Sequence, residues 1–112
     1  MSFRSQRIGE EIRKVLSKRL IKGLTIPLQG FVTISHVDLS KDLSHANVYY
    51  SVYGKKEECE ATKEALIKQT KELRKEIGTK LRLRYVPNVK FVLDGTPENA
   101  EKINKLLTKN LK

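Results

Sequence analysis

Residues 46–53, Ala-Asn-Val-Tyr-Tyr-Ser-Val-Tyr, decide the fold because apolar and polar side chains alternate along them. In an extended chain every second side chain lies on the same face. One face therefore carries Ala46, Val48, Tyr50 and Val52, and the other carries Asn47, Tyr49 and Ser51. Residues 31–37 repeat the alternation, with Val32 and Ile34 on the apolar face. A sheet with one apolar and one polar face is covered by helices on one side only.

Helical patterns flank these two strands. Residues 4–24 place one apolar stripe at helical spacing, made of Ile8, Ile12, Val15, Leu16 and Leu20. A long helical period starts near Glu57 and keeps its phase to Leu81, and a third strand follows with Val89, Phe91 and Leu93 facing inward. Thr96-Pro97 is typical of a helix start, so a short final helix is expected over residues 96–111. The order predicts an α+β domain.

Charge is the strongest compositional signal. The 112 residues contain 23 Lys and Arg against 13 Asp and Glu, a net charge of +10. The length suits one domain, and no internal repeat or linker divides it. Half of the net charge lies on the first helix. A field of this sign attracts polyanions. Nucleic acid is the commonest such partner, but a membrane surface or an acidic protein would feel the same attraction.

The sequence has no residue pattern that is typical of a catalytic or metal-binding site. Cys59 is the single cysteine and lies among glutamates, which disfavour a reactive thiolate. His36 and His45 are nine residues apart and lack metal-ligand spacing, so they are interpreted as surface residues. The glycines stand apart and form no phosphate-binding loop. We therefore expect no enzyme activity, catalytic residue, metal, cofactor or small-molecule substrate.

The compartment is also predicted from simple patterns. The basic start is followed by a charged helix, unlike a signal peptide. No apolar run approaches the length of about 18 residues that a membrane span needs. A lone cysteine suits a reducing compartment. These features predict a cytoplasmic protein with no membrane partner.

One basic run has a predicted geometry. If residues 80–85 are extended, Lys80, Arg82 and Arg84 point one way and the intervening side chains point to the core. Such a ridge could contact a phosphodiester backbone, although an ordinary solvated charge run is, by itself, the slightly better explanation. Tyr49 on the polar sheet face could stack on a base, or it could simply reflect strand propensity.

Two separated motifs resemble the bacterial ribosome-binding factor A family. The first is Val37-x-Leu39-Ser40-x-Asp42-Leu43-x-x-Ala46-x-Val48-Tyr49. The second includes Leu73-Arg74 and then Leu81-Arg82-Leu83-Arg84-x-x-Pro87-x-Val89-x-Phe91-x-x-Asp94. The resemblance runs from about Arg4 to Leu107.

The resemblance implies a KH-like fold of the second type, a three-stranded mixed sheet packed on one face by helices in the order α-β-β-α-α-β with a short C-terminal helix. Residues 1–112 would form a single KH-like RNA-binding domain. It implies a non-catalytic protein that binds the small (30S) ribosomal subunit and its 16S rRNA during late maturation and rRNA processing, and that aids growth in the cold. A monomer is expected from the polar open face.

Residue by residue, the resemblance assigns phosphate contact to a set of basic positions: Arg4, Arg7, Lys71, Arg74, Lys80, Arg82 and Arg84. Asp42 and Ser40 are expected to order the hairpin loop. The alternative function is an autonomous basic nucleic-acid-binding protein not tied to the ribosome. That alternative explains the charge but leaves both motifs as coincidence.

The sequence departs from the family pattern at two places. The family has a kinked helix built on Ala-x-Gly, whereas this chain has Gln69-Thr70-Lys71. Either a kink near Thr70 is kept by packing, which we favour, or Gly78 supplies the break. No Gly-x-x-Gly loop of an ordinary KH domain is present. Ile26 stands where the family usually has Asp, so the contact of the first helix can differ there.

Overall fold

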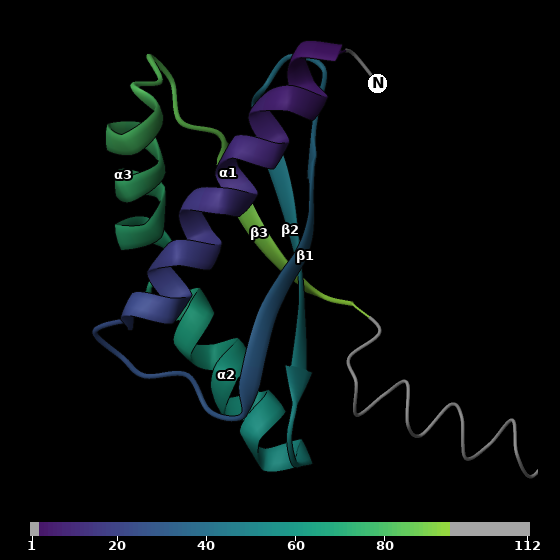
Figure 1. The fold of residues 1–112 in the computed structure, drawn as a ribbon, viewed down its shortest axis with the longest axis vertical. Helices are drawn as coiled ribbons and strands as arrows, with labels where there is room; N and C mark the ends of the chain where they lie inside the picture. Colours follow the sequence, from purple (N-terminus) through teal and green to yellow (C-terminus); the bar gives the residue numbers. More distant parts are fainter. Residues whose placement is uncertain (1–2, 95–112) are drawn as a thin grey trace, which may run out of the picture.

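The computed structural model describes residues 3–94. The elements follow the order α1 (Phe3–Lys22), β1 (Phe31–Leu39), β2 (His45–Tyr53), α2 (Lys56–Lys68), α3 (Thr70–Leu81) and β3 (Asn88–Leu93). Figure 1 shows the three helices on one side of the sheet. Among residues 3–94 no helix covers the other side, which we call the open face. This is the predicted α+β order. The final helix expected over residues 96–111 lies outside the described residues.

The sheet is mixed, with β2 in the centre. β1 pairs antiparallel with β2, from Phe31 opposite Tyr53 to Leu39 opposite Ala46. β3 pairs parallel with β2 over the half nearer the hairpin loop, from Asn88 opposite His45 to Leu93 opposite Tyr50. A parallel pairing needs a crossover, and α2 and α3 supply it.

A β-bulge at Ser35 changes which residues of β1 face the core. The pairing register shifts between Ile34 and His36. The extra residue reverses the alternation, so that Ile34 is buried before the bulge and Val37 and Leu39 are buried after it. The simple alternation predicted for residues 31–37 is therefore wrong at its end. The Ser35 hydroxyl donates to the carbonyl oxygen of Tyr49 at 3.1 Å.

The hairpin loop between β1 and β2 is ordered by Ser40 and Asp42, as predicted. The Asp42 carboxylate accepts hydrogen bonds from the hydroxyls of Ser40 and Ser44 at 2.8 and 2.7 Å. The Ser40 hydroxyl in turn accepts from the backbone N–H groups of Ser44 and His45. Because these bonds stabilise the ionised carboxylate, the hydroxyl of Ser44 first, the pKa of Asp42 is lowered to about 2.

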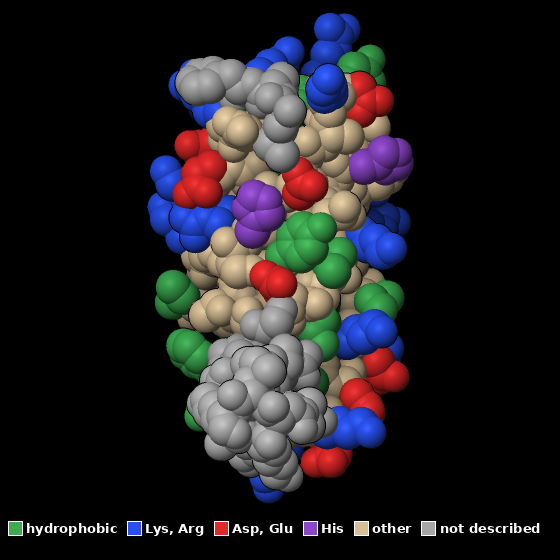
Figure 2. Space-filling model, turned by 90° about the vertical axis from the view of Figure 1, so that its right-hand side faces the viewer, with side chains coloured by type: hydrophobic (Ala, Val, Ile, Leu, Met, Phe, Trp, Pro, Cys, Tyr) green, Lys and Arg blue, Asp and Glu red, His purple; other side chains and the backbone are tan. Residues whose placement is uncertain are grey.

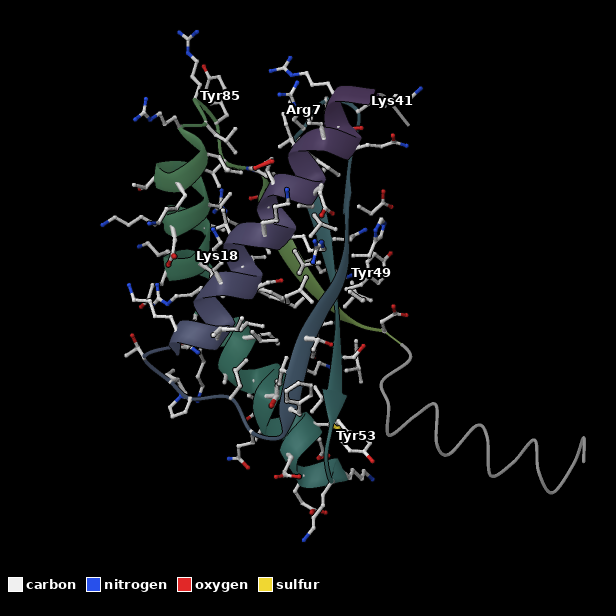
Figure 3. All side chains as sticks on the ribbon, in the orientation of Figure 1. Arg7, Lys18, Lys41, Tyr49, Tyr53 and Tyr85 are labelled. Carbon is white, nitrogen blue, oxygen red and sulfur yellow. The ribbon has the colours of Figure 1, made fainter. Side chains whose placement is uncertain are left out.

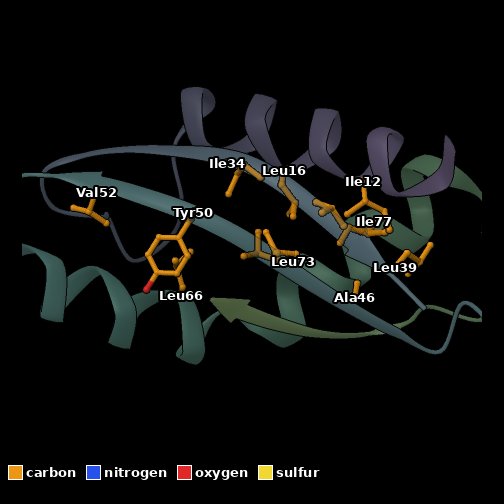
Figure 4. Packing of buried hydrophobic residues seen from close by; sticks show 12 residues of the cluster. Ile12, Leu16, Ile34, Leu39, Ala46, Tyr50, Val52, Leu66, Leu73 and Ile77 are labelled. Carbon is orange, nitrogen blue, oxygen red and sulfur yellow. The ribbon is translucent and has the colours of Figure 1, made fainter. Parts of the chain in front are cut away.

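The core lies between the sheet and the helices (Figure 4). Ile12 and Leu16 of α1 pack over the centre of the sheet, and α3 contributes Leu73 and Ile77. Each buried side chain of this size contributes about 1.5–3 kcal/mol of transfer free energy. The apolar stripes read from the sequence thus fix which side of α1 and α3 faces inward.

The long helix is interrupted at Gln69, which separates α2 from α3. Gln69 has φ −103° and ψ 8°, outside helical values, and its side chain is only 3% exposed. The kink confirms the interpretation that packing near Thr70, not Gly78, breaks the helix. Gly78 lies within α3, where a Cβ atom would approach Cγ2 of Val86 to 2.6 Å. Glycine there allows the chain before β3 to lie against the helix.

Two buried polar side chains fasten the α1–β1 connector to this kinked helix. The Gln69 amide accepts from the backbone N–H of Ile26 and donates to its carbonyl oxygen, both at 2.8 Å. Seven residues earlier, on α2, the Thr62 hydroxyl accepts a hydrogen bond from the backbone N–H of Gln29 at 3.0 Å and donates one to the Gln29 carbonyl oxygen at 2.6 Å. The backbone N–H and carbonyl groups of Ile26 and Gln29 are therefore hydrogen-bonded although neither residue belongs to a strand. Ile26 contacts the kinked helix through its backbone.

Candidate nucleic-acid interface

The basic residues predicted on α1 and those predicted near residue 82 lie at the same end of the molecule. α1 and α3 run antiparallel, since Arg19 contacts Glu72 and Glu76 while Val15 lies across a groove from Lys80. The start of α1 therefore lies beside the loop that follows α3. Figure 3 shows Arg7, Lys41 and Tyr85 at this same end. Two basic regions that are far apart in the sequence, the start of α1 and the loop after α3, thus reach the same end of the molecule.

The extended ridge predicted for residues 80–85 is wrong. Lys80 is part of α3, and Arg82 ends the helix in the left-handed conformation, with φ 53° and ψ 44°. The backbone N–H of Arg82 donates to the carbonyl of Gly78, so helical hydrogen bonding persists into this segment. Lys80, Arg82 and Arg84 are all exposed, but they lie at and after the end of a helix and not along an extended strand. Tyr85, expected inward, is 80% exposed.

Arg84 and Tyr85 form a local pair. The guanidinium carbon of Arg84 lies 5.9 Å from the centroid of the Tyr85 ring, within the range of a cation–π contact. The pair leaves the charge in solvent and adds an exposed aromatic ring beside it. An exposed ring next to a cation is a surface on which an unpaired base can stack.

Arg74 has a structural task inside the protein. Its Nε donates to the carbonyl oxygen of Pro87 at 3.0 Å, and its Nη2 donates to that of Val86 at 3.1 Å. These bonds hold the chain entering β3 against α3. The remaining N–H groups of the guanidinium are the ones left for an external phosphate, so the predicted phosphate contact of Arg74 stays a prediction.

Lys71 lies apart from the other predicted residues. It lines a shallow surface groove with Lys68, Arg74 and Lys75, whereas Lys80 lines the groove that separates α3 from α1. The structure therefore groups Arg4, Arg7, Lys80, Arg82 and Arg84 toward α1, and leaves Lys71 on a different side of α3.

Three lysines of α1 were missed as site residues. Lys14, Lys18 and Lys22 continue the line of Arg4 and Arg7 along the same side of the helix, and all five side chains are exposed. We call these five residues the basic stripe. Their signal was present in the sequence, because positions 4, 7, 14, 18 and 22 recur at helical spacing. Figure 3 shows Lys18 on the side of α1 that faces α3.

Ion pairs next to the basic stripe neutralise nearby acids. The Arg19 guanidinium binds the carboxylates of both Glu72 and Glu76. The hydrogen bond to Glu76 is the main reason why the pKa of Arg19 is raised. Arg13 binds Glu10 on α1, and this hydrogen bond lowers the pKa of that carboxyl. These acids are therefore paired with arginines and do not oppose the stripe as isolated charges.

The open face of the sheet has a different character. Figure 2 shows both histidines and acidic side chains within this face, with Lys and Arg mostly at its margins. The ring of Tyr49 lies 5.8 Å from that of His36, and Phe31 and Tyr53 face each other in register with 68% and 55% of their surface exposed. Within the part of the chain that the structure describes, no group of three or more His, Cys, Asp or Glu side chains could hold a metal ion.

Among residues 3–94, no helix combines the length and the apolar character that crossing a lipid bilayer requires.

A three-stranded mixed sheet, helices on one face and a basic helical surface define a KH-like α+β domain. The family model described as "Ribosome-binding factor A" matches residues 4–107. The chain belongs to the ribosome-binding factor A family.

Relatives of that name support the assignment. The protein of Brevibacillus brevis is 42% identical over 104 residues, which cover 93% of this chain and 86% of the relative. The protein of Clavibacter michiganensis is 39% identical over 104 residues, covering 93% of this chain. The chain spans 63% of the length of that Clavibacter protein and 61% of the Clavibacter sepedonicus relative.

Solved structures agree on the fold. The solution structure of a Thermotoga maritima protein assigned as a ribosome binding factor A is 34% identical, with a TM-score of 0.71 over 87% of this chain and 93% of that one. A Thermus thermophilus ribosome binding factor A, fitted into a cryo-EM map of a 30S complex, has a TM-score of 0.67 over 80% of this chain and 94% of that one. It is 22% identical, so it supports the fold alone.

Proposed function

We propose that this chain binds the small (30S) ribosomal subunit and its 16S rRNA during late subunit maturation and rRNA processing, without catalysing a reaction. Family membership over residues 4–107 carries the proposal, because the family is named for ribosome binding. The Thermus factor placed in a 30S complex makes the small subunit the specific target to test. A ribosomal partner would place the protein in the cytoplasm, with a role in growth in the cold.

The proposed contact surface is the end of the molecule where α1 and the α3–β3 loop meet. Arg4, Arg7, Lys80, Arg82 and Arg84 are exposed there, and lysines and arginines in such positions bind phosphates without reading sequence. Lys71 and Arg74 would add contacts from the other side of α3. In this proposal residues 1–112 act as a single KH-like RNA-binding domain and as a monomer.

Co-sedimentation with purified 30S subunits, 50S subunits and 70S ribosomes tests the proposal. We expect selective retention on 30S subunits at two salt concentrations and in the presence of excess duplex RNA. The logarithm of affinity should fall with the logarithm of salt with a slope of about −4 to −5 if about six phosphates are contacted. Equal, salt-sensitive binding to every particle and to duplex RNA would favour the autonomous nucleic-acid-binding protein instead.

A further inference from the structure

A groove of about 410 Å³ runs between α1 and α3, next to the proposed contact surface. Lys14, Lys18 and Lys22 line it from α1, and Lys80 lines it from the end of α3. The groove follows the same side of α1 that carries Arg7 nearer the helix start. It therefore continues the basic surface at the end of the molecule along the length of α1.

The lysines of α1 are regularly spaced. Lys14, Lys18 and Lys22 follow each other at intervals of four residues, so each step advances about 6 Å along the helix axis. Three ammonium groups in a row at such intervals match a ligand that presents negative charge repeatedly along a line. A nucleic-acid backbone is such a ligand, whereas a single small anion would use only one or two of these groups.

Acidic residues of the groove are already paired. Glu76 binds Arg19, which also lines the groove, and the Glu11 carboxylate lies 3.9 Å from the ammonium nitrogen of Lys14. Within residues 3–94, Lys18, Lys22 and Lys80 form no ion pair with a carboxylate of the protein. These three charges are therefore available to an external anion, and Lys14, whose side chain is 56% exposed, keeps ammonium N–H groups that do not face Glu11.

The shape of the groove favours a single strand. The ion pairs from Arg19 to Glu72 and Glu76 hold α1 against α3, so the lysines of α1 and Lys80 of α3 line the two sides of one groove. Proteins that bind single-stranded nucleic acid without reading its sequence use a positively charged groove that follows the backbone. One strand with its bases turned outward is therefore the ligand that matches this groove.

We propose that the α1–α3 groove binds the backbone of a single-stranded RNA segment, with Lys14, Lys18, Lys22 and Lys80 contacting successive phosphates. This inference rests on the proposed function in choosing RNA as the polyanion. It goes beyond that function because it assigns RNA contacts to residues outside the family motifs and specifies that the RNA is single-stranded. The proposed strand runs along α1, starting from the Arg82–Arg84 loop.

The test compares two triple variants with the same change of charge. The groove variant is Lys14→Gln, Lys18→Gln and Lys22→Gln, and the control is Lys56→Gln, Lys63→Gln and Lys90→Gln, all at exposed positions. Fluorescence anisotropy measures the binding of a labelled single-stranded oligouridylate and of an RNA duplex of equal length, over a series of salt concentrations. Circular dichroism checks that both variants are folded.

For the single strand, the groove variant should reduce the steepness of the salt dependence by about 2, since each lost phosphate contact on a single strand contributes about 0.7. The control should leave the slope within about 0.5 of the original protein, and the duplex should respond equally weakly to both variants. Equal losses in the two variants, or a loss for the duplex as large as for the single strand, would overturn the proposal.

The result separates this inference from the proposed function. If the unaltered protein binds oligouridylate through these lysines but does not sediment with 30S subunits, the proposed function is contradicted and the inference about the groove is supported. Unaltered protein that sediments with 30S subunits, while the groove variant binds single-stranded RNA normally, would contradict the groove alone.

Discussion

The helical face and the open sheet face are both exposed, but they present opposite chemistry to solvent. The helical face carries the basic stripe of α1, with its neighbouring acids paired to Arg13 and Arg19. The open sheet face carries histidine and tyrosine rings and acidic side chains, with the cations mostly at its margins (Figure 2). The net charge of +10 is therefore not spread evenly over the surface. A polyanion would meet the helices first.

The strongest predicted change is in stability, and it concerns the hydrogen bonds that hold the α1–β1 connector to the kinked helix. In Gln69→Leu, the side chain keeps a similar size but cannot bond to the backbone of Ile26. We expect a loss of about 2 kcal/mol in the free energy of unfolding, because the partly buried N–H and carbonyl of Ile26 lose their partner. Urea denaturation measures the loss.

Hydrogen exchange tells whether the effect is confined to one region. Exchange should accelerate in the connector of residues 24–30 and stay slow in the β1–β2 hairpin. Lys68→Ala, at the exposed neighbouring position, is the control and should change stability by less than about 0.5 kcal/mol. Uniform acceleration across the hairpin would mean that the two regions unfold as one unit.

The next effect compares the two faces in binding. Arg82→Ala and Arg84→Ala should each weaken binding to 30S subunits about fivefold, or about 1 kcal/mol, as expected for a lost charge-assisted contact. On the open face, His36→Ala and Tyr49→Ala should change the affinity by less than about twofold. Quantitative sedimentation measures all four variants.

The opposite ranking of these variants would move the contact surface to the sheet. A strong loss in Tyr49→Ala alone would support the interpretation that this ring stacks on a base. Unchanged affinity in both arginine variants, with folding intact, would remove the α3–β3 loop from the contact surface.

The smallest effect concerns pH and the hairpin loop. The folded state lowers the pKa of Asp42 from an ordinary 3.8 to about 2, so the ionised carboxylate favours folding. Its contribution is complete above the ordinary pKa and is lost as the pH falls from about 4 to about 2. Urea midpoints of the original protein and of Asp42→Asn should therefore differ at about pH 6 and converge near pH 2. A constant difference over this range would show that the loop does not depend on the charge.

Much of the fold could be predicted because periodicity reports burial directly. The alternation in residues 46–53 and the apolar stripe of α1 predicted a sheet covered on one side. Ser40 and Asp42 predicted an ordered hairpin loop. Side-chain periodicity and the hydrogen bonds within a loop both depend on residues that are close in sequence. The bulge at Ser35 was not predicted, because one inserted residue changes the register only relative to β2. The exposed position of Tyr85 was missed for a similar reason, since α3 continues to Leu81.

Local spacing and composition are enough to predict the element order, the inward faces and the sign of the charge. Which charges act together depends on how the helices pack. The antiparallel packing of α1 and α3 brings Arg7 to the same end of the molecule as the loop that follows α3 (Figure 3). It also places Lys18 and Lys80 along one groove and pairs Arg19 with Glu72 and Glu76. It also assigns Arg74 to the loop carbonyls. Distances between residues far apart in sequence depend on how helices pack, and no local pattern records them.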